Sequence, residues 1–199
     1  VSLTSGPLGG MLNMEGYAMK KILITTYGDH GKACLHTDYM NAVLKEGGLA
    51  WGLPLTGEEH VLNAYLQEAD GLVIASPVYY AMGNGTLVSF VQRLFYSTMF
   101  DKSMKVGASV VVARRGGLSS TYDELNKFFG ISGMPIASGQ YWNSLHGGKP
   151  GEVEQDTEGM QGMRTLARNM AFLMKSIALG KAQYGLPEKE KIIFTNFVR

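Results

Sequence analysis

The chain has 199 residues, one cysteine, a formal net charge of +1 and 45% apolar residues. These values fit one globular domain and exclude a disordered chain, an internal disulfide, and any zinc or iron–sulfur site that needs several cysteines from one chain. The balanced charge argues against unassisted binding of nucleic acid or an acidic membrane surface. No apolar run approaches the roughly 20 residues of a membrane helix.

The first 18 residues show neither helical nor strand periodicity, and they lack the basic start and apolar centre of a signal peptide. The first predicted strand follows directly after Met19. Two interpretations stay open for 1–18: a translated leader that precedes a native start at Met19, or a disordered or tag-derived N-terminus. In both cases we expect a single domain over 19–199. A chain with one cysteine fits a reducing compartment, so we expect a cytoplasmic protein.

Short apolar runs alternate with amphipathic helices along the rest of the chain. The predicted strands cover 21–26, 49–55, 71–75, 106–113 and 134–138. The predicted helices cover 37–46, 58–68, 86–96, 121–129 and 159–179. The methionines of the last helix recur at helical spacing, which we interpret as core packing and not as a metal or redox feature. This order predicts a three-layer α/β/α sandwich with a five-stranded parallel sheet.

Ligands of such sheets bind beyond the carboxyl ends of the strands. Three glycine-rich loops are expected there, at 27–33, 76–85 and 114–120. The second loop reads Ser76-Pro77-Val78-Tyr79-Tyr80-Ala81-Met82-Gly83. Its proline keeps the backbone extended, and its tyrosines offer flat faces and hydroxyl groups, which suits a planar aromatic ring with polar edges. The alternative is a proline–aromatic turn that packs on its own helix.

The other two loops carry charge and glycine. Arg114-Arg115-Gly116-Gly117 combines fixed cations with backbone N–H groups that can face a ligand. A solvated surface pair is the alternative reading of these arginines. The first loop stands before a helix N-terminus, where phosphates bind; its candidate residues are Gly28, His30, Gly31 and Lys32. The histidines show no metal-ligand spacing, and Cys34 is interpreted as a packing residue, so we predict no metal site and no catalytic side chain.

A longer pattern points to a known family. Residues 69–95, ADGLVIASPVYYAMGNGTLVSFVQRLF, resemble the NADPH-dependent FMN reductases and iron–sulfur flavoproteins, which are flavodoxin-like. The resemblance continues through 110–127, 134–142, 155–173 and Thr195-Asn196-Phe197. It implies that FMN packs its ring against the loop at 77–82 and meets the loop at 114–117 with its polar edge. It also implies a homodimer or larger homo-oligomer in which the neighbouring subunit covers the flavin. Our candidate for that cover is Tyr141–Pro150.

The first third of the chain departs from this family. The family's usual phosphate loop is absent from 27–35, and so are the cysteines of the iron–sulfur members, so no cluster is expected. Residues 36–55 instead resemble class I glutamine amidotransferase-like hydrolases of γ-glutamyl compounds. The nucleophilic cysteine of those enzymes has no counterpart here, so that chemistry is not carried over.

The resemblance implies an FMN-dependent oxidoreductase that takes hydride from NAD(P)H and passes electrons to a quinone, free flavin, nitro compound or protein acceptor. Two alternatives stay open. One is an FMN-binding electron carrier without NAD(P)H activity. The other, motivated by the altered first loop, is a cofactor-free scaffold of the same fold. The sequence does not choose between NADH and NADPH, because it holds no dinucleotide-binding fingerprint.

Overall fold

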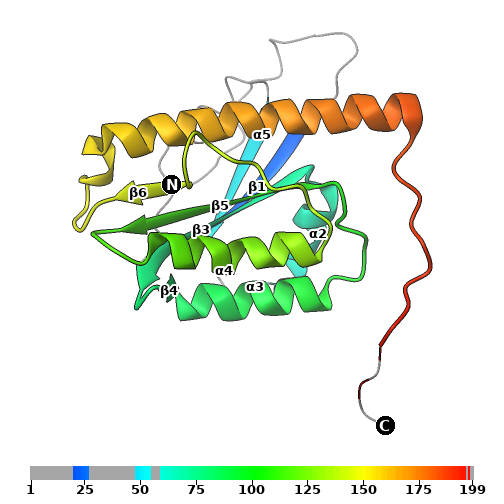
Figure 1. Ribbon diagram of the computed structural model, residues 1–199, viewed down its shortest axis with the longest axis horizontal. Coiled ribbons are helices and arrows are strands. Elements are labelled where there is room, and N and C mark those ends of the chain that lie inside the picture. Colours follow the sequence, from blue (N-terminus) through cyan, green and yellow to red (C-terminus); the bar gives the residue numbers. More distant parts are fainter. Residues whose placement is uncertain (1–19, 27–47, 55–58, 196, 198–199) are drawn as a thin grey trace.

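The computed structural model describes residues 20–26, 48–54, 59–195 and 197. The predicted leader, the first loop at 27–33 and the helix expected at 37–46 lie outside these residues. Figure 1 shows a sheet with α5 along one face and α3 and α4 along the other. The described helices are α2 (Glu59–Glu68), α3 (Gly85–Ser97), α4 (Leu118–Ile131), α5 (Thr157–Tyr184) and the short 3₁₀ helix η2 (Val153–Gln155).

The sheet follows the order β2-β1-β3-β5-β6, and every pair along this path is parallel. The strands of the path are β1 (Lys20–Thr26), β2 (Gly48–Pro54), β3 (Gly71–Tyr79), β5 (Val106–Ala113) and β6 (Ser144–His146). A two-residue strand, β4 (Met82–Gly83), pairs antiparallel with the end of β3. The order 2-1-3-4-5 of the parallel strands is that of flavodoxin-like doubly wound sheets, so the predicted fold class is confirmed.

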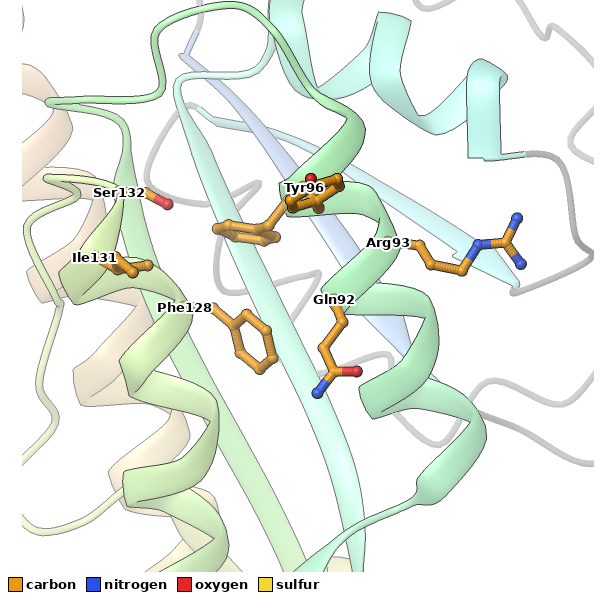
Figure 2. Close-up of a pocket in the computed structure, with 7 residues that line it drawn as sticks. Gln92, Arg93, Tyr96, Phe128, Ile131 and Ser132 are labelled. Carbon is orange, nitrogen blue, oxygen red and sulfur yellow. The ribbon is translucent and has the colours of Figure 1, made fainter. Parts of the chain in front are cut away.

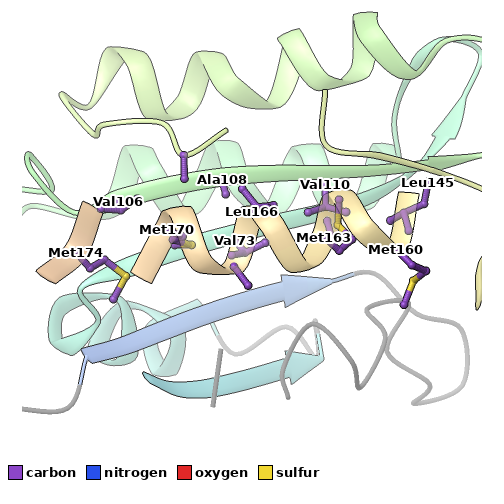
Figure 3. Packing of buried hydrophobic residues seen from close by; sticks show 13 residues of the cluster. Val73, Val106, Ala108, Val110, Leu145, Met160, Met163, Leu166, Met170 and Met174 are labelled. Atoms are coloured by element: carbon purple, nitrogen blue, oxygen red, sulfur yellow. The ribbon is translucent and has the colours of Figure 1, made fainter. Parts of the chain in front are cut away.

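Alternate residues of the central strands face two separate cores, as the pleat of a strand requires. On one face, Val73 of β3 and Val106, Ala108 and Val110 of β5 pack against α5 (Figure 3). The methionines of α5 fill this core, which confirms their predicted role: Met160, Met163, Met170 and Met174.

The other core lies between the sheet and the remaining helices. Leu72 and Ile74 of β3 point into it and meet Leu66 of α2. Helices α3 and α4 supply further large side chains to this core, namely Leu87, Phe90, Leu94, Leu125 and Phe129. The two cores hold β3 and β5 from both faces, so the ends of these strands are rigid supports for the loops that follow them.

The predicted end of β3 and the predicted start of α4 differ from the structure. β3 continues to Tyr79, so the first part of the expected loop at 76–85 is strand. Pro77 still pairs with Val112 of β5, and the next two residues gain a ladder from β4. The extended φ of proline suits the end of a strand, where the missing N–H costs little. Helix α4 begins at Leu118 and not at 121, because Gly117 takes a left-handed conformation directly before it.

The predicted fifth strand at 134–138 is wrong in its bounds. Only Ile136 bridges to Gly107, and the continuous pairing with β5 is made further on, by β6. Asn143 explains the interruption. Its buried side chain accepts a hydrogen bond from the Gly139 N–H, and its backbone carbonyl accepts the N–H of Val111. The chain therefore leaves the sheet edge after 137 and returns to it at 144. Among the helices of the described residues, none has the length and apolar character needed to cross a membrane.

Candidate functional site

The loops predicted to bind a ligand meet at the carboxyl ends of β3 and β5. At this edge, the left end in Figure 1, lie the β3–β4 hairpin, the loop after β5 and the loop after β6. The hairpin and the loop after β5 touch directly, because an added Cβ on Gly117 would lie 2.8 Å from the Cα of Ala81. The structure thus brings two of the three predicted loops together. The third, with Gly28, His30, Gly31 and Lys32, lies outside the described residues.

The tip of the β3–β4 hairpin is a strained turn that presents aromatic side chains. Tyr80 and Ala81 have φ values of 51° and 62°, the left-handed pair of a type I′ turn between Tyr79 and Met82. Such a conformation is costly for residues other than glycine, and it persists only where surrounding contacts impose it. Tyr80 is 98% exposed, and Tyr79 and Met82 are exposed on either side of it.

Hydrogen bonds with Ser76 of β3 and with two residues of α4 impose this turn. The Ser76 hydroxyl accepts the N–H of Asn84 at 2.9 Å, and the Glu124 carboxylate accepts the N–H of Gly83 at 2.7 Å. The Ser120 hydroxyl donates to the carbonyl of Ala81 at 2.8 Å. Ser76 and Gly83 are buried, and their polar atoms in these bonds already have partners. These two residues therefore shape the turn, and within the hairpin the residues exposed to a ligand are Tyr79, Tyr80, Ala81 and Met82.

The loop after β5 forms an electropositive corner beside the hairpin. Gly117 (φ 90°) precedes α4, and among the described residues no side chain caps this helix and no acidic residue stands in its first turn. Uncapped N–H groups and the helix dipole favour an anion or a hydrogen-bond acceptor at this end. Arg115 is exposed next to it. The stem of Arg114 lies along Gly148 of the loop after β6, where an added Cβ would meet its Cγ at 3.2 Å.

The surface around Gly116, in the loop after β5, is open to solvent. Gly116 is exposed, and an added Cβ there would meet no atom within 4 Å. Pro77, Val78 and Gly117 are half-buried and support the corner from within. Flat exposed aromatic faces, guanidinium groups and uncapped backbone N–H groups suit a planar ring with an acceptor-rich edge. The sequence reasoning missed the roles of Glu124 and Ser120, because no local pattern marks a contact between residues about 40 positions apart.

The end of β6 carries a second polar arrangement. Asp156 accepts the backbone N–H groups of Gly159 and His146 at 2.9 and 2.7 Å, and its carboxylate lies 3.5 Å from Nδ1 of His146. Burial raises the pKa of Asp156, but these hydrogen bonds outweigh it and hold the pKa below its usual value. In the part of the chain that the structure describes, no three histidine, cysteine or acidic side chains gather as metal ligands would.

Comparisons with known proteins agree with this geometry. Residues 59–148 match the sequence model of a family described as NADPH-dependent FMN reductase. This segment is similar to the NADPH-dependent FMN reductases. The match spans α2 to β6 and so includes both the hairpin and the corner after β5. The predicted resemblance is confirmed, whereas the resemblance of 36–55 to γ-glutamyl hydrolases stays a prediction.

Two curated relatives of this chain are iron–sulfur flavoproteins. One, from Methanocaldococcus jannaschii, is 29% identical over 62% of this chain and 68% of its own length. Another, from Methanosarcina thermophila, is 32% identical over 56% of this chain and 60% of its own length. The chain thus spans about three fifths to two thirds of the length of these relatives.

A solved structure shows the same fold. A WrbA-like flavodoxin from Agrobacterium tumefaciens superposes with a TM-score of 0.60 at 17% identity, over 79% of this chain and 98% of that one.

Proposed function

We propose that this chain binds FMN and acts as an oxidoreductase that takes hydride from NAD(P)H. The acceptor would be a quinone, free flavin, nitro compound or protein. The observation that carries the proposal is the strained aromatic hairpin tip, which several contacts hold beside the uncapped start of α4. It lies within the segment that matches the FMN reductase family. Strain of this kind is maintained at sites that hold ligands.

The donor set fits the isoalloxazine of FMN. Tyr79, Tyr80 and Met82 offer apolar and aromatic surface to its faces. Arg114, Arg115 and the N–H groups at the start of α4 offer positive charge and donors to its acceptor-rich N1/O2 edge. When bound, FMN supplies the hydride and electron chemistry. The protein's residues orient the ring and stabilise negative charge at that edge. We keep Gly28, His30, Gly31 and Lys32 as the proposed phosphate contacts.

The assembly and location of the protein belong to the same proposal. We expect a cytoplasmic homodimer or larger homo-oligomer in which Tyr141–Pro150 of a neighbour covers the ring. The exposed side chains of Tyr141 and Trp142, whose ring centroids lie 4.7 Å apart, support this expectation, because they form an aromatic surface next to β6.

An absorption spectrum tests the function. The purified chain is measured alone, then with added FMN, and then with NADPH or NADH in the absence of air. We expect a yellow complex that bleaches with one of the two nucleotides. A yellow protein that neither nucleotide bleaches would establish the electron-carrier alternative. A colourless protein that leaves added FMN free would establish the cofactor-free scaffold and overturn the proposal.

A further inference from the structure

We propose that the C-terminal arm of one copy docks in an apolar groove between α3 and α4 of a second copy. The C-terminal arm consists of residues 187–195 and 197, and the groove is the space lined by Gln92, Arg93, Phe95, Tyr96, Phe128, Ile131 and Ser132. This inference rests on exposed apolar surface at two places in the chain. It does not depend on FMN binding.

The groove is large and its floor is aromatic. Its volume is about 620 Å³, and Phe128 and Gln92 point into the space between the two helices (Figure 2). The Phe95 ring packs against Phe128 with centroids 5.5 Å apart, which makes the floor a packed surface. Tyr96 and Ile131 on the walls are 93% and 89% exposed. A contiguous apolar surface of this kind marks an interaction site in soluble proteins.

The C-terminal arm carries the second apolar surface. It leaves α5 after Gly185 and runs away from the domain as an extended segment (Figure 1). Lys189 binds the Asp101 carboxylate at 2.6 Å and so ties the root of the arm to the loop after α3. Beyond this point Ile193 is 90% exposed and Phe194 is 87% exposed, and Ile192 and Phe197 are exposed with them. So many large apolar side chains in one short segment need a partner.

The arrangement favours a second copy as that partner. The arm starts at the end of the domain where α3 and α4 also end (Figure 1), yet its apolar side chains do not enter the groove of their own chain. From 190 to 197 an extended chain can reach about 25 Å, which is enough to cross to a neighbour. Because every copy has one arm and one groove, a two-fold pair satisfies both surfaces of both copies at once.

A disulfide trap tests where the arm docks. Cysteines replace Ile131 and Phe194 in a chain in which Cys34 is replaced by serine. We expect oxidation to give a covalent dimer of twice the chain mass. The control pairs Phe194→Cys with Phe172→Cys, an exposed position on α5, and should give no rapid cross-link. A cross-link within one chain would show that the arm closes on its own groove and would overturn the proposal, as would the absence of any cross-link.

Analytical ultracentrifugation, which gives the mass of the protein in solution, provides a second test of the proposed dimer. We expect the native chain to sediment as a dimer, and we expect Phe194→Asp and Ile131→Asp each to raise its dissociation constant at least tenfold. Phe172→Asp should leave the dissociation constant unchanged. All three positions are exposed, so the variants should fold. A native monomer, or a dimer whose dissociation constant neither Phe194→Asp nor Ile131→Asp changes, would overturn the proposal. Because FMN is absent from these measurements, failure here is distinct from failure of the proposed function.

Discussion

Among single residues, the site depends on Tyr80 and Ala81, two neighbours with unusual backbone angles. Tyr80 and Ala81 occupy left-handed conformations that cost about 1–3 kcal/mol each when the residue is not glycine. The contacts that offset this cost come from Ser120, Glu124 and Gly117. The aromatic tip and the start of α4 are therefore one structural unit, and a change in either displaces both.

Replacing Gly117 by alanine tests this unit. The new Cβ would sit at a φ of +90° and within 3.0 Å of both Ala81 and Val78. We expect the free energy of unfolding to fall by about 1–3 kcal/mol, from backbone strain and displacement of the hairpin. Urea titration measures this. Gly116→Ala is the matched control, since its Cβ meets no atom within 4 Å. Equal losses in both variants would contradict the argument.

The two arginines should set the reduction potential of bound FMN. Loss of a hydrogen bond from a charged group costs about 1.5–3 kcal/mol, which for two electrons corresponds to about 30–60 mV. We expect Arg114→Gln and Arg115→Gln together to lower the midpoint potential by at least this amount, because negative charge on the reduced ring is less well stabilised. A redox titration against reference dyes gives the value. Arg168→Gln, an exposed change on α5, is the control. An unchanged midpoint potential would show that the two arginines do not interact with the flavin ring.

At the scale of elements, α5 joins the core to the carboxyl edge of the sheet. Its methionine face fills one core, and its N-cap residue Asp156 also accepts the backbone N–H of His146 in β6. One carboxylate thereby fixes both the start of the helix and the end of the strand. The depressed pKa of Asp156 means that its ionised form is the one that holds this junction.

Asp156→Asn should therefore change the acid dependence of stability. A carboxyl whose pKa is lower in the folded state stabilises the fold above its unfolded pKa of about 4 and loses that effect as the pH falls through the folded value. At pH 7 we expect the variant to be about 1 kcal/mol less stable, because asparagine still caps the helix but carries no charge. The difference should shrink as the pH approaches 2.

Thermal unfolding from pH 2 to 7 measures this trend. Asp123→Asn on α4 is the control, because Asp123 is exposed, and we expect no such trend from it. A stability gap between Asp156→Asn and the native chain that stays constant with pH would show that the charge of Asp156 does not hold the junction.

In the whole molecule, the two cores and the interrupted sheet edge determine which loops and apolar side chains are exposed at each end of the domain. The cores hold β3 and β5 from both faces, so the loops at their carboxyl ends are carried on a stiff support. The excursion at 138–143 places the exposed Tyr141 and Trp142 close to the same edge. At the opposite end of the domain, the C-terminal arm leaves apolar side chains without cover. The proposed ring-binding edge and the C-terminal arm thus lie at opposite ends of the domain (Figure 1).

Much of this architecture follows from local pattern. The bounds predicted for β5 match those observed. α2 begins one residue later than predicted, and α3 extends one residue beyond its predicted bounds at each end. These segments are long apolar or amphipathic runs, whose burial is decided by the spacing of their own residues. The predictions failed where contacts between distant residues outweigh the local sequence pattern. Pro77 lies inside a strand, and the pairing expected at 134–138 moved to β6 because Asn143 holds the chain away from the edge.

Local patterns predict the alternation of strands and helices, the methionine core, the resemblance to the FMN reductases and the loops at the carboxyl edge of the sheet. Packing decides which residues of those loops support the site and which are exposed to solvent. Ser76 and Gly83 share a motif with Tyr80, yet they are buried and bonded, whereas Tyr80 faces solvent. That division depends on Glu124 and Ser120, which reach the hairpin from a helix about 40 residues away. Contacts over such separations arise when the chain packs, and no spacing within the motif encodes them.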